Sequence, residues 1–508
     1  MNTDVEHSLH GPGRILSLRR GGHLALVEFE ALALPTLIPT RELRSIGQTP
    51  VVLSSLEGAT AEPVPEQVMG TRDATSSLLA LEAMRLGVVP AHDLDAYTVG
   101  REAELRAVDS DLDEVDAHGG AARVFLADYG VGKTHLLELV QEAALKRNFL
   151  TARVVLDARE MAPSHPRRVF HGLMRTLRYP DRPFEDGRGL GPLLDRALLS
   201  DDVRRDFHLD GWSRDANLPA LLDEGMHLYL SPALIYLDAI SDEGRLRKDR
   251  VDAWDEESYR QDARQLLLTW LEGSPTESNK AIVEHLSALR GPFPHLYSLM
   301  DYRPWARIYS YLLSGIAALA RAVGYGGLVV LFDEAELYSL LSTQNRDYAK
   351  FVFKSISCAS LGQDAVPFDA DELNLGGYGI LQDLPPRYGD AAGLYSVFAM
   401  TPNADGLETL HEAVPASRIS ELERLGSEDY AELARRVCDF YASSRPDWRL
   451  HSEAARELEF ILVAMTESGH ITNPRQAMKL LIEALDIHRH FPDRARGVIR
   501  NLQSLASF

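Results

Sequence analysis

The chain has 508 residues, 45% of them hydrophobic and 25% charged, which is ordinary for a folded protein but too long for one hydrophobic core. Its formal net charge of −22 repels phosphate backbones, so nonspecific coating of nucleic acid is not expected. A local basic groove stays possible, and a protein partner fits the charge at least as well. The two cysteines, Cys358 and Cys438, lie far apart without metal-ligand spacing, which argues against a disulfide framework or a zinc site.

Neither a signal peptide nor a membrane span is expected. The first residues lack a basic start followed by an apolar run, and no window approaches the roughly 18 uninterrupted apolar residues that a span requires. The shortage of cysteine also favours a reducing compartment. We therefore predict a cytoplasmic protein without membrane contact.

Residues 1–56 contain short alternating runs separated by tight turns, at 14–18, 24–29 and 36–39. This pattern predicts a small SH3-like or Tudor-like β-barrel, and the alternative is a β-hairpin that pads the next domain. The charges of this segment balance, so nothing marks it as a platform for nucleic acid. Residues 57–72 lack periodicity and are predicted to be a linker.

Residues 73–415 have the pattern of a P-loop α/β domain with a parallel sheet. Apolar strands are predicted at residues 122–126, 152–156, 327–332 and 394–400. Between the second and third of these strands, residues of about 160–325 are mostly helical, and we interpret them as a long insertion. The helical stretch at 416–508 is predicted to form a C-terminal lid or a winged helix.

A phosphate-binding loop follows the first of these strands, with the sequence Ala127-Asp128-Tyr129-Gly130-Val131-Gly132-Lys133-Thr134. A loop whose N–H groups point at a phosphate chain needs glycines where side chains would collide, and the next helix directs its positive end at the same anion. Lys133 would reach the β- and γ-phosphates, and the Thr134 hydroxyl would bind Mg²⁺. The candidate ATP-binding residues here are Gly130, Val131, Gly132, Lys133, Thr134 and His135. The consensus of this Walker A motif opens with glycine, and Ala127 departs from it.

A Walker B pattern lies 200 positions after Lys133, where an apolar strand ends in Asp333 and Glu334. Asp333 would hold the Mg²⁺ through water, and Glu334 would orient or activate the attacking water. The alternative is a strand that ends in a solvated acidic turn. The 17 histidines form no ligand pattern, so no metal beyond Mg²⁺ is indicated.

Three further polar positions are candidates for the same site. Thr401 follows the strand at 394–400 and is predicted to face the γ-phosphate, with Asn403 or a plain turn as alternatives. The stretch Val99-Gly100-Arg101 is predicted to strap the adenine base, and the alternative is an ordinary helix start with Arg101 exposed. Arg475 opens a helix and is predicted to touch the γ-phosphate, unless it is a surface arginine. Arg346 and Arg418 are weaker candidates for an arginine finger.

Several motifs occur in one order along the chain: Gly87-Val88-Val89-Pro90, Thr98-Val99-Gly100-Arg101-Glu102, the loop ending in Lys133-Thr134, the strand ending in Asp333-Glu334, and Pro474-Arg475. Over roughly residues 75–490 they resemble the ATP-binding proteins of the bacteriophage-exclusion (BREX) defence systems, a group related to the origin-recognition branch of AAA+ ATPases. The resemblance implies an AAA+ fold, ATP and Mg²⁺ as ligands, and phage defence beside a helicase or nuclease. It carries over Lys133 and Asp333 as nucleotide and Mg²⁺ ligands, followed by Glu334, Thr401 and Arg475 as catalytic candidates.

Residues 11–16 onward resemble instead the small barrels of CarD-like and Tudor-like modules, which dock on other proteins. We therefore keep two other functions beside Mg²⁺-dependent ATP hydrolysis. One is a nucleotide-dependent signalling switch with little turnover, and the other is a transcription regulator whose barrel contacts polymerase. AAA+ sites are often completed by a neighbour's arginine, so the resemblance also implies a homo-oligomer.

Overall fold

The structure is a computed structural model that divides the chain into two compact units, Met1–Thr71 and Arg72–Phe508. It describes five short strands in the first unit, and in the second unit residues 74–90, 93–182, 188–213, 218–247, 256–274, 279–335, 340–373, 384–402, 404–495, 497–498 and 501. The predicted linker at 57–72 and the candidate Asn403 lie outside the described residues.

The first unit contains a five-stranded antiparallel sheet with the order β4-β3-β2-β1-β5. Its strands are β1 (Thr3–His7), β2 (Gly11–Arg19), β3 (Leu24–Phe29), β4 (Thr36–Pro39) and β5 (Leu43–Ser45). The predicted alternating runs are thus confirmed as strands. Among the described strands no pairing joins β4 to β5, so a closed barrel is not seen and stays a prediction.

The second unit is built on a five-stranded parallel sheet with the order β10-β6-β9-β8-β7. Its strands are β6 (Gly120–Leu126), β7 (Leu150–Val155), β8 (Leu328–Asp333), β9 (Leu394–Met400) and β10 (Ile419–Glu421). The predicted α/β class and the four apolar strands are confirmed, whereas the three-residue β10 was not predicted. Because β9 lies between β6 and β8, the residues that follow these three strands meet at one edge of the sheet.

Both faces of this sheet are buried, which explains the uninterrupted apolar run of β8 before Asp333. One face contributes Phe125, Val329, Leu331 and Val397 to one hydrophobic core, and the other contributes Val124, Val330, Phe332 and Phe398 to a second core. The first core also contains α3 and the C-terminal helices, and the second contains most of the helices between β7 and β8. The strands β6, β8 and β9, which end at the site, therefore belong to a sheet that packs against a hydrophobic core on each face.

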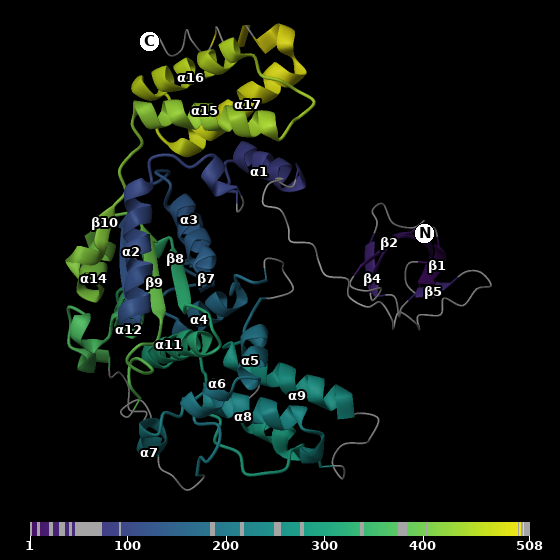
Figure 1. The fold of residues 1–508 in the computed structure, drawn as a ribbon, viewed down its shortest axis with the longest axis vertical. Coiled ribbons are helices and arrows are strands. Elements are labelled where there is room, and N and C mark those ends of the chain that lie inside the picture. The colour runs from purple at the N-terminus through teal and green to yellow at the C-terminus, as the bar shows by residue number, and fades with distance from the viewer. Residues whose placement is uncertain are drawn as a thin grey trace. The chain divides into compact units, whose positions relative to one another are not determined.

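The second unit contains sixteen described α-helices. They are α1 (Ala74–Leu86), α2 (Glu102–His118), α3 (Lys133–Lys146), α4 (Pro166–Arg175), α5 (Gly191–Leu198), α6 (Asp201–Asp206), α7 (Leu218–Asp223), α8 (Leu230–Ser241), α9 (Glu256–Leu271), α10 (Asn279–His285), α11 (Ala306–Ala322), α12 (Thr343–Leu361), α14 (Ala404–Ala413), α15 (Ser427–Ser443), α16 (Ser452–Glu467) and α17 (Pro474–His490). In Figure 1, α2, α3, α11 and α12 lie beside the strands of the sheet, whereas α15 to α17 and α7 to α9 lie beyond its two ends. Helices α4 to α11 lie between β7 and β8, in the segment predicted to be helical. Of these, α11 packs directly on β8, β9 and α12, so it belongs to the core of the α/β unit.

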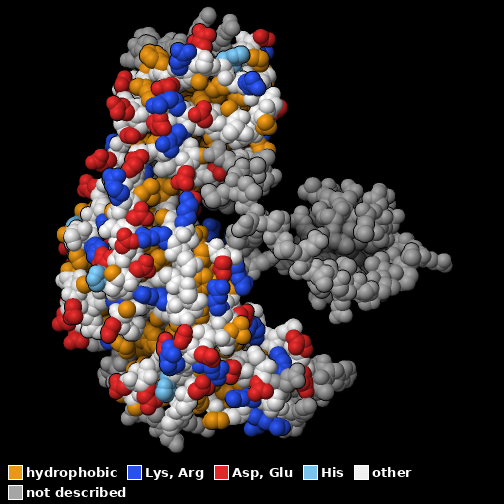
Figure 2. Space-filling view, viewed as in Figure 1, with side chains coloured by type: hydrophobic (Ala, Val, Ile, Leu, Met, Phe, Trp, Pro, Cys, Tyr) orange, Lys and Arg blue, Asp and Glu red, His pale blue; other side chains and the backbone are white. Residues whose placement is uncertain are grey.

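Helices α15, α16 and α17 pack against one another, and α1 packs on α17 beside them (Figure 1). On the face of the second unit drawn in Figure 2, acidic and basic side chains are interspersed, so on this face the negative charge is not gathered in one patch. No described helix is long and apolar enough to cross a membrane.

Candidate functional site

The loop after β6 has the backbone conformation that a phosphate-binding loop needs. Gly130 and Gly132 have φ values of +84° and +114°, a region that side chains disfavour. Gly132 is the N-cap of α3, so the positive end of this helix faces the loop. Ala127 N–H donates to the carbonyl of Met400 at 3.0 Å, and its backbone does not have a positive φ. Ala127 therefore extends the ladder between β6 and β9, and this backbone does not require the glycine of the consensus.

Lys133 and Thr134 reach the ends of the two neighbouring strands. The Nζ of Lys133 donates to Thr401 Oγ1 at 2.7 Å and to the carbonyl of Ala127 at 3.1 Å. The hydroxyl of Thr134 donates to Asp333 Oδ2 at 3.1 Å, across 199 positions of sequence. Lys133 is 7% exposed, so its charge is largely withdrawn from water. The sheet order thus brings the loop after β6, the end of β8 and Thr401 together at one edge.

Asp333 is the last residue of β8 and is 2% exposed. Its Oδ1 accepts the N–H of Glu334 at 3.0 Å, and its Oδ2 accepts from Arg153 Nη2 at 2.7 Å in addition to Thr134. Glu334 is exposed and has a φ of +57°, a strained conformation for a residue with a side chain. Strain of this kind persists only where the surrounding structure holds it in place, and it is concentrated at functional sites.

A hydroxyl and a carboxylate oxygen in contact fit Mg²⁺, which prefers oxygen ligands and completes its shell with phosphates and water. Among the described residues, no group of three or more His, Cys, Asp or Glu converges in a metal-binding arrangement. The residues present therefore fit a metal that is held jointly with a nucleotide better than a metal held by protein alone.

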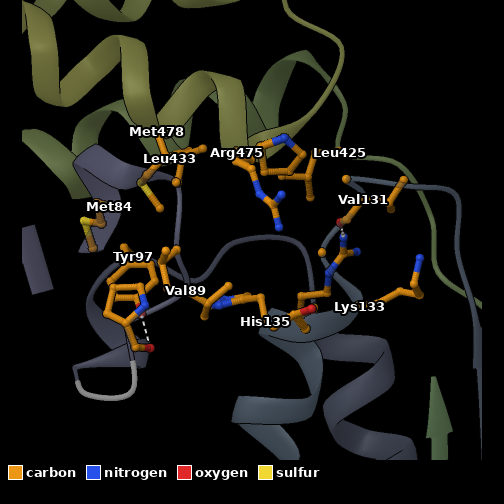
Figure 3. A pocket seen from close by; sticks show the side chains of 18 of the residues that line it. Met84, Val89, Tyr97, Val131, Lys133, His135, Leu425, Leu433, Arg475 and Met478 are labelled. Atoms are coloured by element: carbon orange, nitrogen blue, oxygen red, sulfur yellow. Dashed lines mark hydrogen bonds between the residues drawn. The ribbon is translucent and has the colours of Figure 1, made fainter. Parts of the chain in front are cut away.

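An apolar pocket continues from the phosphate loop to the turn after α1 (Figure 3). Its apolar lining consists of Met84, Val88, Val89, Pro90, Tyr97, Val99, Leu425, Leu433 and Met478. Figure 3 shows Leu433, Met478 and Arg475 facing Val89, His135 and Lys133 across the pocket. A flat base needs apolar walls with a few polar atoms, and this end of the pocket offers that chemistry.

His135 is the polar group at the apolar end. Its Nε2 lies 2.8 Å from Thr98 Oγ1, and its ring lies 5.6 Å from that of Tyr97. Burial lowers the pKa of His135 to about 4, with a further contribution from the charge of Arg101. His135 is therefore neutral at physiological pH.

Arg101 lies beneath the phosphate loop and is 3% exposed. Its guanidinium donates to the carbonyls of Val131 at 2.8 Å and of Glu423 at 3.0 Å, and it pairs with Glu104 at 3.5 Å. Burial lowers the pKa of Arg101, and the charge of Glu104 opposes that shift. Arg101 is thus not an exposed residue at an ordinary helix start. It joins the loop to the segment that leads into α15.

Helix α17 reaches the phosphate loop with its first turn. The Arg475 guanidinium lies 5.8 Å from the centre of the Tyr129 ring and donates to its hydroxyl at 3.3 Å. A Cβ at Gly130 would lie 3.0 Å from Asn473, and one at Gly87 would lie 2.6 Å from Lys479, so both glycines permit close approach of this helix.

The two weaker arginine candidates lie elsewhere, since neither lines this pocket. Arg418 pairs with Asp111 at 3.2 Å and with Glu114 at 2.5 Å, both of which lie on α2. Arg346 donates to the carbonyl of Leu341 at 3.1 Å.

The family model described as "BREX system ATP-binding protein BrxC/D" matches residues 73–356, which is more than half of the chain. The chain belongs to this BREX family of ATP-binding proteins. The resemblance drawn from the sequence motifs is thereby confirmed, and with it an ATP-binding component of an anti-phage defence system. No curated protein matches the chain.

In this BREX protein, sequence reasoning missed Arg153, which pairs with Asp333, and Glu138, which pairs with Arg153. The available signal was a charged residue in the middle of the apolar run at 152–156, where a strand buried on both faces has no place for an unpaired charge. It also missed Tyr97 and the residues of α15 and α17 that complete the apolar end of the pocket.

Proposed function

We propose that this BREX protein is an AAA+ ATPase that binds ATP with Mg²⁺ between the phosphate loop and α17 and hydrolyses it. The observation that carries the proposal is the 3.1 Å hydrogen bond between Thr134 and Asp333, beside the buried ammonium of Lys133. Two motifs that are far apart in sequence are needed in one place for phosphoryl transfer. A structural acidic turn would have no reason to meet the threonine of a phosphate loop.

The binding roles follow from the two ends of the pocket. The N–H groups of the loop around Val131 and the Lys133 ammonium bind the phosphates. The adenine base lies at the apolar end, against Val89 and Tyr97, with neutral His135 as its polar neighbour. Thr134 and Asp333 hold Mg²⁺, which when bound supplies positive charge to the phosphate oxygens.

Hydrolysis is assigned to residues around the position of the γ-phosphate. Glu334 follows the metal-binding aspartate and orients the attacking water, and its strained backbone supports a functional role. Thr401 contacts Lys133 and is the candidate γ-phosphate sensor at the end of β9. Arg475 enters from α17 and changes partner from Tyr129 to phosphate as the nucleotide binds.

The AAA+ assignment is supported by the insertion of β9 between the strands of the two Walker motifs. Helices α15 to α17 act as the lid, because they contribute Leu433, Arg475 and Met478 to the pocket. The N-terminal sheet is proposed to be a Tudor-like or CarD-like docking module. Its partner would be a helicase or nuclease of the defence system.

The test is equilibrium binding of a fluorescent ATP analogue together with steady-state hydrolysis. Lys133→Ala is expected to weaken nucleotide binding at least about tenfold, whereas Glu334→Gln should bind normally and lose about a hundredfold or more in turnover. Lys146→Ala is the matched control, since Lys146 lies on the same helix with its side chain 59% exposed. If wild type binds ATP but is as inactive as Glu334→Gln, a nucleotide-dependent switch replaces the ATPase. If wild type and Lys133→Ala bind equally, the site is wrong.

A further inference from the structure

Arg153 is a basic residue in direct contact with the carboxylate that the proposed function assigns to Mg²⁺. It lies on β7, where it pairs in register with Leu331 of β8, two positions before Asp333. Nη2 donates to Asp333 Oδ2 at 2.7 Å, and Nη1 donates to Glu138 Oε1 at 2.5 Å. The side chain of Arg153 is 14% exposed and that of Asp333 is 3% exposed, so water screens this pair weakly.

The second carboxylate comes from the helix of the phosphate loop. Glu138 lies four residues after Thr134 on α3, so the two side chains project from the same face of the helix. Thr134 and Arg153 both donate to Oδ2 of Asp333. Oδ2 of Asp333, which the proposed function assigns to Mg²⁺, therefore accepts both the hydroxyl of Thr134 and the guanidinium of Arg153.

Two cations that share one carboxylate oxygen oppose each other. A free divalent ion that approaches Asp333 must displace Arg153 or accept a positive charge close by, and both lower its affinity. Mg²⁺ that arrives with ATP brings the negative phosphates, which the same guanidinium attracts. Arg153 can then release Asp333 while it keeps Glu138, and its Nε makes no hydrogen bond to the described residues that would prevent a rotation.

Resting on the proposed function, we propose that Arg153 blocks Asp333 against free divalent cations, so that the metal binds only together with a nucleotide. Arg153 is thus a positioning residue for the metal site, and Glu138 is the second partner that holds the guanidinium when Asp333 accepts the metal. The arrangement would keep the site from loading with metal alone.

The experiment titrates Mn²⁺ alone into nucleotide-free full-length protein and follows the free ion by electron paramagnetic resonance. Wild type is expected to bind Mn²⁺ weakly, and Arg153→Gln at least about tenfold more tightly, because a unit positive charge has been removed beside the metal. Arg153→Gln combined with Asp333→Asn should lose that gain, which assigns the ion to Asp333. Arg424→Gln removes an equal charge from the exposed pair that Arg424 makes with Asp128 of the phosphate loop, and its Mn²⁺ affinity should stay within about twofold of wild type.

A second variant tests the proposal from the opposite side and guards against misfolding of Arg153→Gln. Glu138→Gln leaves Asp333 as the only carboxylate partner of Arg153, so the Mg²⁺ concentration required for tight binding of a fluorescent ATP analogue should rise several-fold. Equal Mn²⁺ affinity in folded wild type and Arg153→Gln would overturn the proposal, as would an unchanged Mg²⁺ requirement in Glu138→Gln. In either case normal ATP binding by wild type would leave the proposed function standing, whereas no ATP binding by wild type would reject that function itself.

Discussion

The buried guanidinium of Arg101 is predicted to hold the phosphate loop in place, and the variant that tests this is Arg101→Met. Methionine retains an unbranched apolar stem of similar length but removes every donor. The carbonyls of Val131 and Glu423 would lose their charged donor, and Glu104 would remain with its side chain 10% exposed and without its cation. Each hydrogen bond from a charged donor contributes about 1.5–3 kcal/mol, and breaking a buried ion pair costs about 3–5 kcal/mol.

We therefore expect the free energy of unfolding of the second unit to fall by about 3–5 kcal/mol in Arg101→Met. At about 1 °C per kcal/mol for a unit that spans Arg72–Phe508, the Tm would fall by about 3–5 °C. Affinity for a fluorescent ATP analogue should fall at least about tenfold as well, since Val131 lies between the two glycines that shape the loop.

The matched control is Arg424→Gln, which removes an arginine that pairs with Asp128 of the same loop while its side chain is 74% exposed. Such an exposed pair contributes about 0–1 kcal/mol, so the Tm of Arg424→Gln should stay within about 1 °C of wild type. The assay is thermal unfolding followed by intrinsic fluorescence, with and without nucleotide. Equal Tm values for the two variants would refute the reasoning, because they would mean that the buried carbonyls are satisfied without the guanidinium.

Three further predictions concern backbone, pH and assembly. Gly132→Ala forces a side chain into a φ of +114° and should weaken ATP binding at least about tenfold, whereas Gly211→Ala, with a φ of +83° and open space around its Cβ, should leave nucleotide affinity unchanged in the same titration. The pKa of His135 is about 4 in the folded protein, below its unfolded value, so the stability it contributes is complete above pH 6.5 and is lost as pH falls to 4. The free energy of unfolding, measured with urea, should fall by up to about 3 kcal/mol more in wild type than in His135→Gln over that pH window. Parallel pH profiles of the two proteins would contradict this. ATP should promote self-association of Glu334→Gln in light scattering, and a monomer at every nucleotide condition would reject an arginine supplied by a neighbour.

Local sequence determined the elements that carry the phosphate chemistry. A loop that wraps phosphate requires small residues and a lysine directly after a strand, and Gly130, Gly132 and Lys133 satisfy that requirement within a few positions. The run of apolar residues before Asp333 likewise predicts a strand that is buried on both faces. These signals are short in range, because each depends on neighbours along the chain.

Only the tertiary structure decided the contacts between residues that are far apart in sequence. Sequence predicted Arg101 as a strap over the base, but its environment is set by Glu423, 322 positions later, whose carbonyl receives the guanidinium. The three-residue strand β10 is too short to show a periodic pattern in the sequence. It forms because the edge of β6 that does not pair with β9 is free to pair with it. Arg153 meets Asp333 because β7 and β8 pair, although 180 residues separate them. Chain connectivity carries no direct signal for such contacts, since only the packed sheet brings their partners together.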